Sequence, residues 1–297
     1  MKDHEYAIFV IENKCNSKCN ICWIEGADGA LVDLHVISLS YFRKFLESIP
    51  KGRHSGVILS GGEVTLNEQL PEYASCARDY GYRNVMIQTN ARALSDLRKA
   101  EVLKAAGVNQ FFVSFHATDD DLSKRITGRT GAHAQTVRGL ENLDKLGLTV
   151  ITNTVMNSMN YAVLPEIGEF LLRFKNIIEM HFWGYVPMSL KGYELILPYA
   201  LAAPYLNKTL KHLVNHHRGI RVRYFPVCLL DWPYKKFHQM QQPQCYGISR
   251  NFDARYQSCG FQKHPCCEGT DCAGLPEMYQ GTMPGSWMPS VTPKDLG

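Results

Sequence analysis

Six short apolar runs alternate with stretches of helical periodicity through the first two thirds of the chain. The runs are residues 6–11, 56–60, 84–90, 110–116, 149–155 and 179–186. Continuous apolar runs are typical of strands buried on both faces of a parallel sheet. Alternation of such strands with helices predicts an α/β fold, and right-handed crossovers roll six units into a barrel or an open partial barrel.

The expected helices have ordinary lengths and recognisable ends. They are residues 40–49, 68–80, 95–106, 136–146, 164–174 and 199–217, with a short strand at 221–225. Ser38 or Ser40 is a candidate cap for the first helix, which Pro50 ends. The stretch between 116 and 131 reads as a polar connection.

Three cysteines follow the first apolar run directly, at Cys15, Cys19 and Cys22. Neighbouring thiolates suit zinc or an iron–sulfur cluster. The spacing C-x3-C-x2-C lets one short loop bind three corners of a cubane, whereas a structural zinc site requires a fourth ligand, and no fourth cysteine is near in sequence. A cluster with three protein ligands leaves one iron open to a substrate or cofactor.

This motif after a first strand resembles the radical SAM superfamily. In that family the open iron binds S-adenosylmethionine, and the reduced cluster cleaves it to a 5′-deoxyadenosyl radical. The chain departs from the family at Ile21, where an aromatic residue is common. The resemblance covers residues 5–190 and implies a partial (β/α)6 TIM-like barrel that binds a [4Fe-4S] cluster. A zinc site is the alternative interpretation of the thiols.

The second run ends in Gly61-Gly62-Glu63. Glycines let a backbone approach a ligand closely, and a carboxylate can accept hydrogen bonds from an ammonium group. The resemblance implies that this segment binds the methionine amino group of the cofactor. A simple turn is the alternative.

Further cofactor contacts are expected at the ends of the following strands. The candidates are Thr89, Asn90, Ser114, Arg129 and Asn153. By the same resemblance, Ser114 and Arg129 hold the methionine carboxylate and ribose, and Asn153 contacts the adenosine. A turn role for Thr89 and Asn90, a solvated loop cation at Arg129 and a buried structural amide at Asn153 stay open.

The segment 228–280 is rich in cysteine, glycine and proline. Its cysteines are Cys228, Cys245, Cys259, Cys266, Cys267 and Cys272. A segment with so few apolar runs needs a metal centre to order it. The arrangement resembles the truncated SPASM, or twitch, extensions that carry an auxiliary cluster, and a zinc knot is the alternative. The predicted organisation is a barrel at 1–190, a connection at 191–227, this extension, and an extended tail at 281–297.

Composition limits the cellular setting. Ten cysteines, with no signal peptide and no apolar run of about 20 residues, indicate a reducing compartment and no membrane span, so a cytoplasmic location is expected. A net charge of +4 gives no reason to expect nucleic-acid binding.

The sequence therefore predicts a radical SAM enzyme that abstracts hydrogen from its substrate, with no catalytic side chain identified. A peptide is the first substrate candidate, and a nucleotide, sugar or other small metabolite is the alternative. Because the chain starts almost at its first strand, a peptide substrate calls for a separate recognition protein. Flavodoxin or ferredoxin is the expected electron donor. A non-catalytic zinc-binding protein is the competing class.

Overall fold

The computed structural model describes residues 6–24, 36–48, 54–187 and 190–239, and three short strands at 244–246, 256–257 and 275–276. The predicted tail and four of the C-terminal cysteines lie outside these residues. No helix in the described ranges is both long and apolar enough to cross a membrane.

One parallel sheet organises the molecule, in the order β7-β6-β5-β4-β3-β2-β1-β8. Its strands are β1 (Tyr6–Glu12), β2 (Gly56–Gly61), β3 (Asn84–Thr89), β4 (Gln110–Ser114), β5 (Thr149–Met156), β6 (Ile177–Gly184), β7 (Gly219–Arg223) and β8 (Gln244–Tyr246). The predicted α/β fold with a parallel, barrel-like sheet is confirmed. The six expected strands form in the expected order, and two more extend the sheet at its edges.

The two added strands come from the part of the chain that follows the six predicted units. The short strand expected at 221–225 forms as β7 and pairs with β6, with Cα partners that include His181 and Arg221. Strand β8 pairs with β1 through Ile8 and Cys245. The antiparallel pair β9 (Tyr256–Gln257) and β10 (Leu275–Pro276) forms a separate small sheet.

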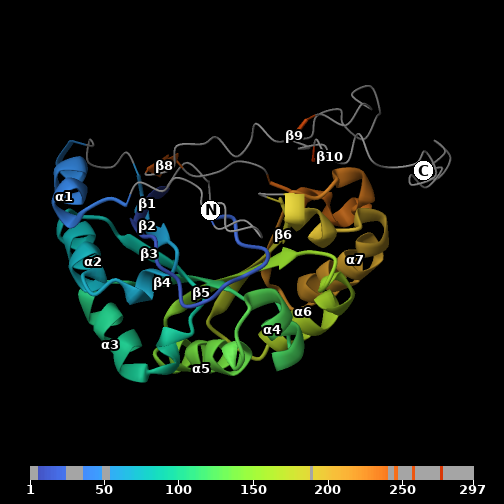
Figure 1. The fold of residues 1–297 in the computed structure, drawn as a ribbon, viewed down its shortest axis with the longest axis horizontal. Coiled ribbons are helices and arrows are strands. Elements are labelled where there is room, and N and C mark those ends of the chain that lie inside the picture. The colour runs from blue at the N-terminus through green and yellow to red at the C-terminus, as the bar shows by residue number, and fades with distance from the viewer. Residues whose placement is uncertain are drawn as a thin grey trace.

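The main helices surround the curved sheet on its outer side (Figure 1). They are α1 (Leu39–Ser48), α2 (Leu70–Asp79), α3 (Leu97–Ala106), α4 (Asp120–Thr127), α5 (Ala132–Lys145), α6 (Leu164–Leu171) and α7 (Tyr199–Asn215). The Ser38 hydroxyl accepts from the Tyr41 N–H at 3.3 Å, so Ser38 caps α1.

Helix α4 lies where the sequence suggested only a polar connection. The Asp119 side chain accepts from the Leu122 N–H at 2.8 Å and so caps its start, and Gly128 ends it with φ of 65°. The polar composition hid this helix because only Leu122, Ser123 and Ile126 face inward.

Alternate residues of each strand pack into different layers. Phe9, Leu59 and Ile87 belong to the large core between the sheet and its helices. The opposite, inner face of the sheet carries a smaller apolar cluster. Its members are Tyr6, Ile8, Ile58, Met86, Phe112 and Ile151, with Trp183 packed against them. The inner face therefore has an apolar floor, and polar groups lie nearer the carboxyl ends of the strands.

Candidate functional site

The cysteine loop, residues 15–22, leaves the carboxyl end of β1. Cys15 is exposed, Cys19 and Cys22 are partly buried, and none of the three is in a disulfide. The Ser17 N–H donates to the Cys15 sulfur at 3.4 Å, and the Cys22 N–H donates to the Cys19 carbonyl at 3.1 Å. Within the described ranges no three His, Cys, Asp or Glu side chains converge on one metal ion. A four-iron cubane binds each thiolate at a different iron, so its ligands do not share one point.

The surroundings of Cys15 favour its neutral thiol. Burial raises its pKa, and the charges of Glu63 and Cys22 act in the same direction. The Ser17 N–H and the Arg92 guanidinium oppose this shift. Metal binding at this position therefore releases a proton.

One side of the cysteine loop is held by the turn after β3. Arg92 Nη1 donates to the Asn16 carbonyl at 2.6 Å and to the Ser17 hydroxyl at 2.9 Å. Arg92 Nε donates to Gln135 on α5 at 2.8 Å. The Asn90 amide donates to Asn16 Oδ1 at 2.7 Å. These bonds fix the loop between its first two cysteines.

The other side of the loop is held by the end of α4. The Lys18 N–H donates to the Thr127 carbonyl, and the Asn20 N–H donates to the Ile126 carbonyl, both at 2.9 Å. A Cβ at Gly128 would lie 2.6 Å from the Lys18 carbonyl oxygen. Only glycine lets the Lys18 carbonyl come this close. The positive φ of residue 128 also favours glycine.

The Gly61-Gly62-Glu63 segment packs against the start of this loop. The Gly62 N–H donates to the Glu12 carbonyl and the Glu63 N–H to the Lys14 carbonyl, each at 2.8 Å. A Cβ at Gly61 would come within 2.0 Å of the Glu12 oxygen, and one at Gly62 within 2.3 Å of the Lys14 oxygen. The two glycines are therefore required by the contact between two backbones, whatever ligand the segment binds.

The Glu63 carboxylate ties β2 to β3. It is fully buried, and one oxygen accepts from the Thr65 N–H at 3.1 Å, the Thr65 hydroxyl at 2.6 Å and the Thr89 hydroxyl at 2.6 Å. The other accepts from the Asn90 N–H at 2.7 Å. Thr89 also accepts from the Ala91 N–H at 2.9 Å. Glu63, Thr89 and Asn90 thus form one internal network, and their expected contacts with a cofactor stay predictions.

The other three candidate contacts, Ser114, Asn153 and Arg129, lie outside this hydrogen-bond network. Ser114 and Asn153 are Cα partners across β4 and β5. Asn153 is 6% exposed, and its Oδ1 atom has no hydrogen-bond partner among the residues that the structure describes. Arg129 is exposed directly after Gly128, beside the cysteine loop. A buried amide oxygen without a partner is unusual, which suits a ligand-contacting position.

The C-terminal cysteines are only partly described. Cys228 is exposed in a short 3-10 helix, Val227–Leu229. Cys245 is the central residue of β8, beside β1. The remaining four candidates lie outside the described residues, namely Cys259, Cys266, Cys267 and Cys272.

Sequence reasoning missed the residues that position the cysteine loop. Arg92 and Asn16 have no recognisable motif, because their roles depend on β1 and β3 ending at the same edge of the sheet. Gly128 carried a weak signal, since a glycine after a helical stretch indicates a left-handed end, but the helix itself was not expected.

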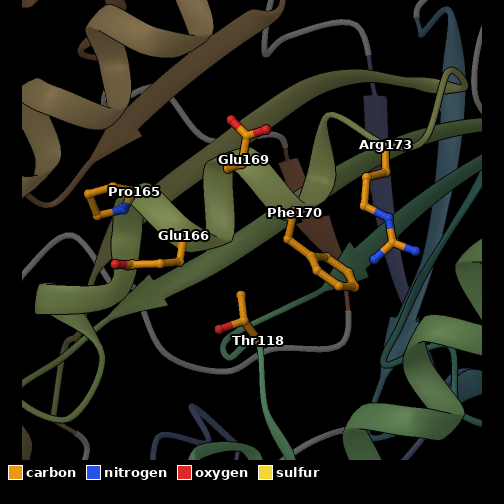
Figure 2. A pocket seen from close by; sticks show the side chains of 6 residues that line it. All are labelled: Thr118, Pro165, Glu166, Glu169, Phe170 and Arg173. Carbon is orange, nitrogen blue, oxygen red and sulfur yellow. The ribbon is translucent and has the colours of Figure 1, made fainter.

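A shallow hollow on the outer side of α6 is separate from this site (Figure 2). Its lining is Thr118, Pro165, Glu166, Glu169, Phe170 and Arg173. The Arg173 guanidinium lies 4.7 Å from the centre of the Phe170 ring. None of the predicted site residues lines this hollow, so we assign no chemistry to it.

The residues present fit an iron–sulfur cluster and a nucleoside cofactor. Three cysteines outside any disulfide share one loop, whose backbone is fixed on two sides. The buried oxygen of Asn153 offers an unused acceptor at the carboxyl end of β5.

Comparison with solved structures places the fold among known enzymes. Streptococcus suis SuiB bound to its precursor peptide SuiA matches with a TM-score of 0.59 and 15% identity, over 74% of this chain and 48% of that one. The enzyme anSMEcpe with bound AdoMet matches with a TM-score of 0.58 and 15% identity, over 73% of this chain and 61% of that one. At this identity the likeness concerns the fold.

Sequence comparison identifies the family. A protein of Saccharolobus solfataricus named "Probable GTP 3′,8-cyclase" is 32% identical over 192 residues, which is 62% of this chain and 59% of that protein. A protein of the same name from Sulfolobus acidocaldarius is 29% identical over 189 residues, 61% of this chain and 56% of that protein. The chain thus spans less than two thirds of the curated relatives it matches. The model of the family described as "Radical SAM superfamily" matches residues 9–171, more than half of the chain. The chain therefore belongs to the radical SAM superfamily of enzymes.

Proposed function

We propose that this protein reductively cleaves S-adenosylmethionine and abstracts a hydrogen atom from a small substrate. The observation that carries the proposal is the position of Cys15, Cys19 and Cys22 on one restrained loop at the carboxyl end of β1. Active sites of βα-barrels are built at this end of the strands. These thiols would hold a [4Fe-4S] cluster, which, when reduced by the electron donor, would supply the electron for cleavage of the sulfonium bond.

The protein's own residues bind and orient the cofactor. The carbonyls of Gly61 and Gly62 are acceptors for the methionine ammonium, and the Glu63 network keeps that segment in place. Arg129 has the fork geometry that pairs with a carboxylate. Ser114 and Asn153 offer a hydroxyl and an amide to the ribose and adenine. These groups fix geometry, because the cofactor carries the difficult chemistry.

A nucleotide is the substrate class that we propose. The relatives that match at about 30% identity are named GTP 3′,8-cyclases. The structural neighbours that are described with peptides, three structures of two proteins, match at only 15% identity. A peptide, which the sequence placed first, is therefore the second candidate, supported by the resemblance of segment 228–280 to twitch extensions.

We further propose an auxiliary cluster in that segment and electron supply by flavodoxin or ferredoxin. Cys259, Cys267 and Cys272 are the preferred ligands. Cys228, Cys245 and Cys266 compete for the fourth position.

Anaerobic purification followed by a cleavage assay tests the proposal. Reconstituted protein, dithionite and S-adenosylmethionine should yield 5′-deoxyadenosine, and the protein should contain iron and sulfide. Replacing Cys15, Cys19 and Cys22 together with Ala should abolish the product. Cys76→Ala, on α2 away from the cysteine loop, is the matched control and should retain full activity. Cleavage by the triple variant, or stoichiometric zinc in place of iron, contradicts the proposal.

A further inference from the structure

The inner face of β6 carries charged and aromatic side chains that the proposed cleavage step does not use. Glu179, His181 and Trp183 alternate along the strand with Met180 and Phe182. Met180 and Phe182 belong to the core beneath the helices. The other three therefore face inward, toward the apolar floor of the barrel.

Glu179 is the centre of a buried charged group. Its Oε1 accepts from Arg221 Nε at 3.1 Å and lies 3.3 Å from His181 Nε2. The side chains of Glu179, His181 and Arg221 are 15%, 5% and 3% exposed. Burial alone would raise the pKa of Glu179, but His181 and Arg221 outweigh it and lower that pKa to about 2. Glu179 is therefore a carboxylate that orients the imidazole.

His181 is held in its neutral form. Burial lowers its pKa, Arg221 and Arg223 act in the same direction, and Glu179 opposes them. A neutral imidazole has one donor and one acceptor nitrogen. Nε2 lies 3.3 Å from the Glu179 carboxylate without the geometry of a hydrogen bond, and this negative charge favours the proton on Nε2, which leaves Nδ1 as the acceptor. Nδ1 is buried, and no group in the described part of the chain donates to it.

Two neighbours of His181 also have unused polar atoms. The ring centres of Trp183 and Phe112 are 5.6 Å apart, and the Arg223 guanidinium carbon lies 5.2 Å from the centre of the Trp183 ring. The Trp183 Nε1 atom is a buried donor that lacks an acceptor within the described residues. Asn153, whose Oδ1 is unused, is the direct Cα partner of His181. Buried polar atoms are rarely left without partners unless a ligand or water supplies them.

The position of these atoms separates substrate from cofactor. The residues expected to hold the cluster and S-adenosylmethionine lie at the ends of β1 to β5. His181 and Trp183 lie on β6, the next strand of the sheet. A molecule bound there would lie next to Asn153, the Cα partner of His181 and an expected contact of the cofactor.

We propose that His181 and Trp183 form a recognition site for a planar heterocycle with an N–H donor beside an acceptor, as in the amide edge of a nucleobase. His181 Nδ1 accepts from the ring N–H, and Trp183 Nε1 donates to the neighbouring carbonyl oxygen. Glu179 and Arg221 act as positioning residues that hold the imidazole. This inference rests on the proposed nucleotide substrate.

Binding of GTP to the reconstituted, cofactor-loaded protein tests the site. His181→Leu should raise the Kd for GTP at least tenfold, whereas His181→Gln, which keeps an acceptor and a donor toward Glu179, should stay within threefold of wild type. His212→Leu, at a partly exposed position on α7, is the control and should not change Kd. In the wild-type protein, 1-methyl-GTP, which lacks the ring N–H, should bind at least tenfold more weakly than GTP.

The outcomes separate this inference from the proposed function. Cleavage of S-adenosylmethionine without GTP is measured in the wild-type protein and in the His212→Leu control, and it should be the same in both. If the wild-type protein cleaves S-adenosylmethionine, three results would each refute the recognition site without refuting the cleavage activity. The first is that His181→Leu binds GTP as wild type does. The others are that wild type binds 1-methyl-GTP as tightly as GTP, or that GTP fails to bind at millimolar concentration. If wild type forms no 5′-deoxyadenosine, the proposed function itself fails.

Discussion

The buried Glu63 carboxylate offers a sharp test of how the two strand ends are joined. Glu63→Gln preserves shape but replaces one carboxylate oxygen with an NH2 group. One oxygen faces the Thr65 N–H at 3.1 Å and the other faces the Asn90 N–H at 2.7 Å. In either orientation of the amide, therefore, the new NH2 group meets a backbone N–H. No rotation of the side chain relieves this donor–donor contact.

The expected cost follows from these contacts. The variant loses a charge-assisted hydrogen bond and leaves a buried N–H unpaired, and together these cost about 3 kcal/mol. For a domain of 150–250 residues, each kcal/mol shifts the melting temperature by about 2–4 °C, so Tm should fall by about 6–12 °C.

Thermal and urea unfolding of the cluster-free protein measure this effect. Glu68→Gln is the matched control, because Glu68 is exposed five residues further along the same connection. It should unfold as wild type does. A Glu63→Gln variant within about 0.5 kcal/mol of wild type would show that the network does not restrain the strand ends.

Three further predictions concern the loop, the pH dependence and the second metal site. Arg92→Met removes the guanidinium bonds to Asn16 and Ser17, so the reconstituted variant should lose iron to a chelator several-fold faster than wild type, with unchanged far-UV circular dichroism. Equal rates of iron loss in the two proteins would show that Arg92 does not restrain the cysteine loop. Burial lowers the pKa of His116 from 6.5 to about 4, so the folded protein favours the neutral imidazole. The free energy of unfolding should therefore be highest above pH 6.5 and should fall by about 2–3 kcal/mol between pH 6.5 and pH 4. Urea titrations of His116→Asn should show a weaker dependence of this free energy on pH, and an unchanged dependence would refute the reasoning. Cys272→Ala should lower the iron content without abolishing 5′-deoxyadenosine formation, and unchanged iron would exclude Cys272 as a ligand.

The order of strands and helices was predictable because each unit carries its own periodicity. The runs around Phe9, Leu59 and Ile87 are apolar on both sides of the strand, which only a doubly covered parallel sheet requires. Local signals of this kind survive without knowledge of the tertiary structure. The same holds for Ser38, whose capping role depends on four consecutive residues.

The interior of the site was less predictable because its contacts join distant segments. Arg92 reaches Asn16 across 76 positions of the chain, and Thr89 reaches Glu63 across 26. The sequence suggested Glu63 and Thr89 as ligand contacts from their places at strand ends, but not the bonds that occupy them. The sequence around His181 carries no motif, and only the pairing of β6 with β5 and β7 shows its polar neighbours.

The pairing of β8 with β1 has a consequence for how the chain assembles. Ile8 and Cys245 are adjacent in the sheet but lie 237 residues apart in sequence, so this contact closes a very long loop. During synthesis, one edge of the strand that precedes the cysteine loop stays open until residues 244–246 have left the ribosome. An open edge invites pairing with other chains. Completion of the sheet is thus expected to be a late event, and translation products that end before β8 should be prone to aggregation.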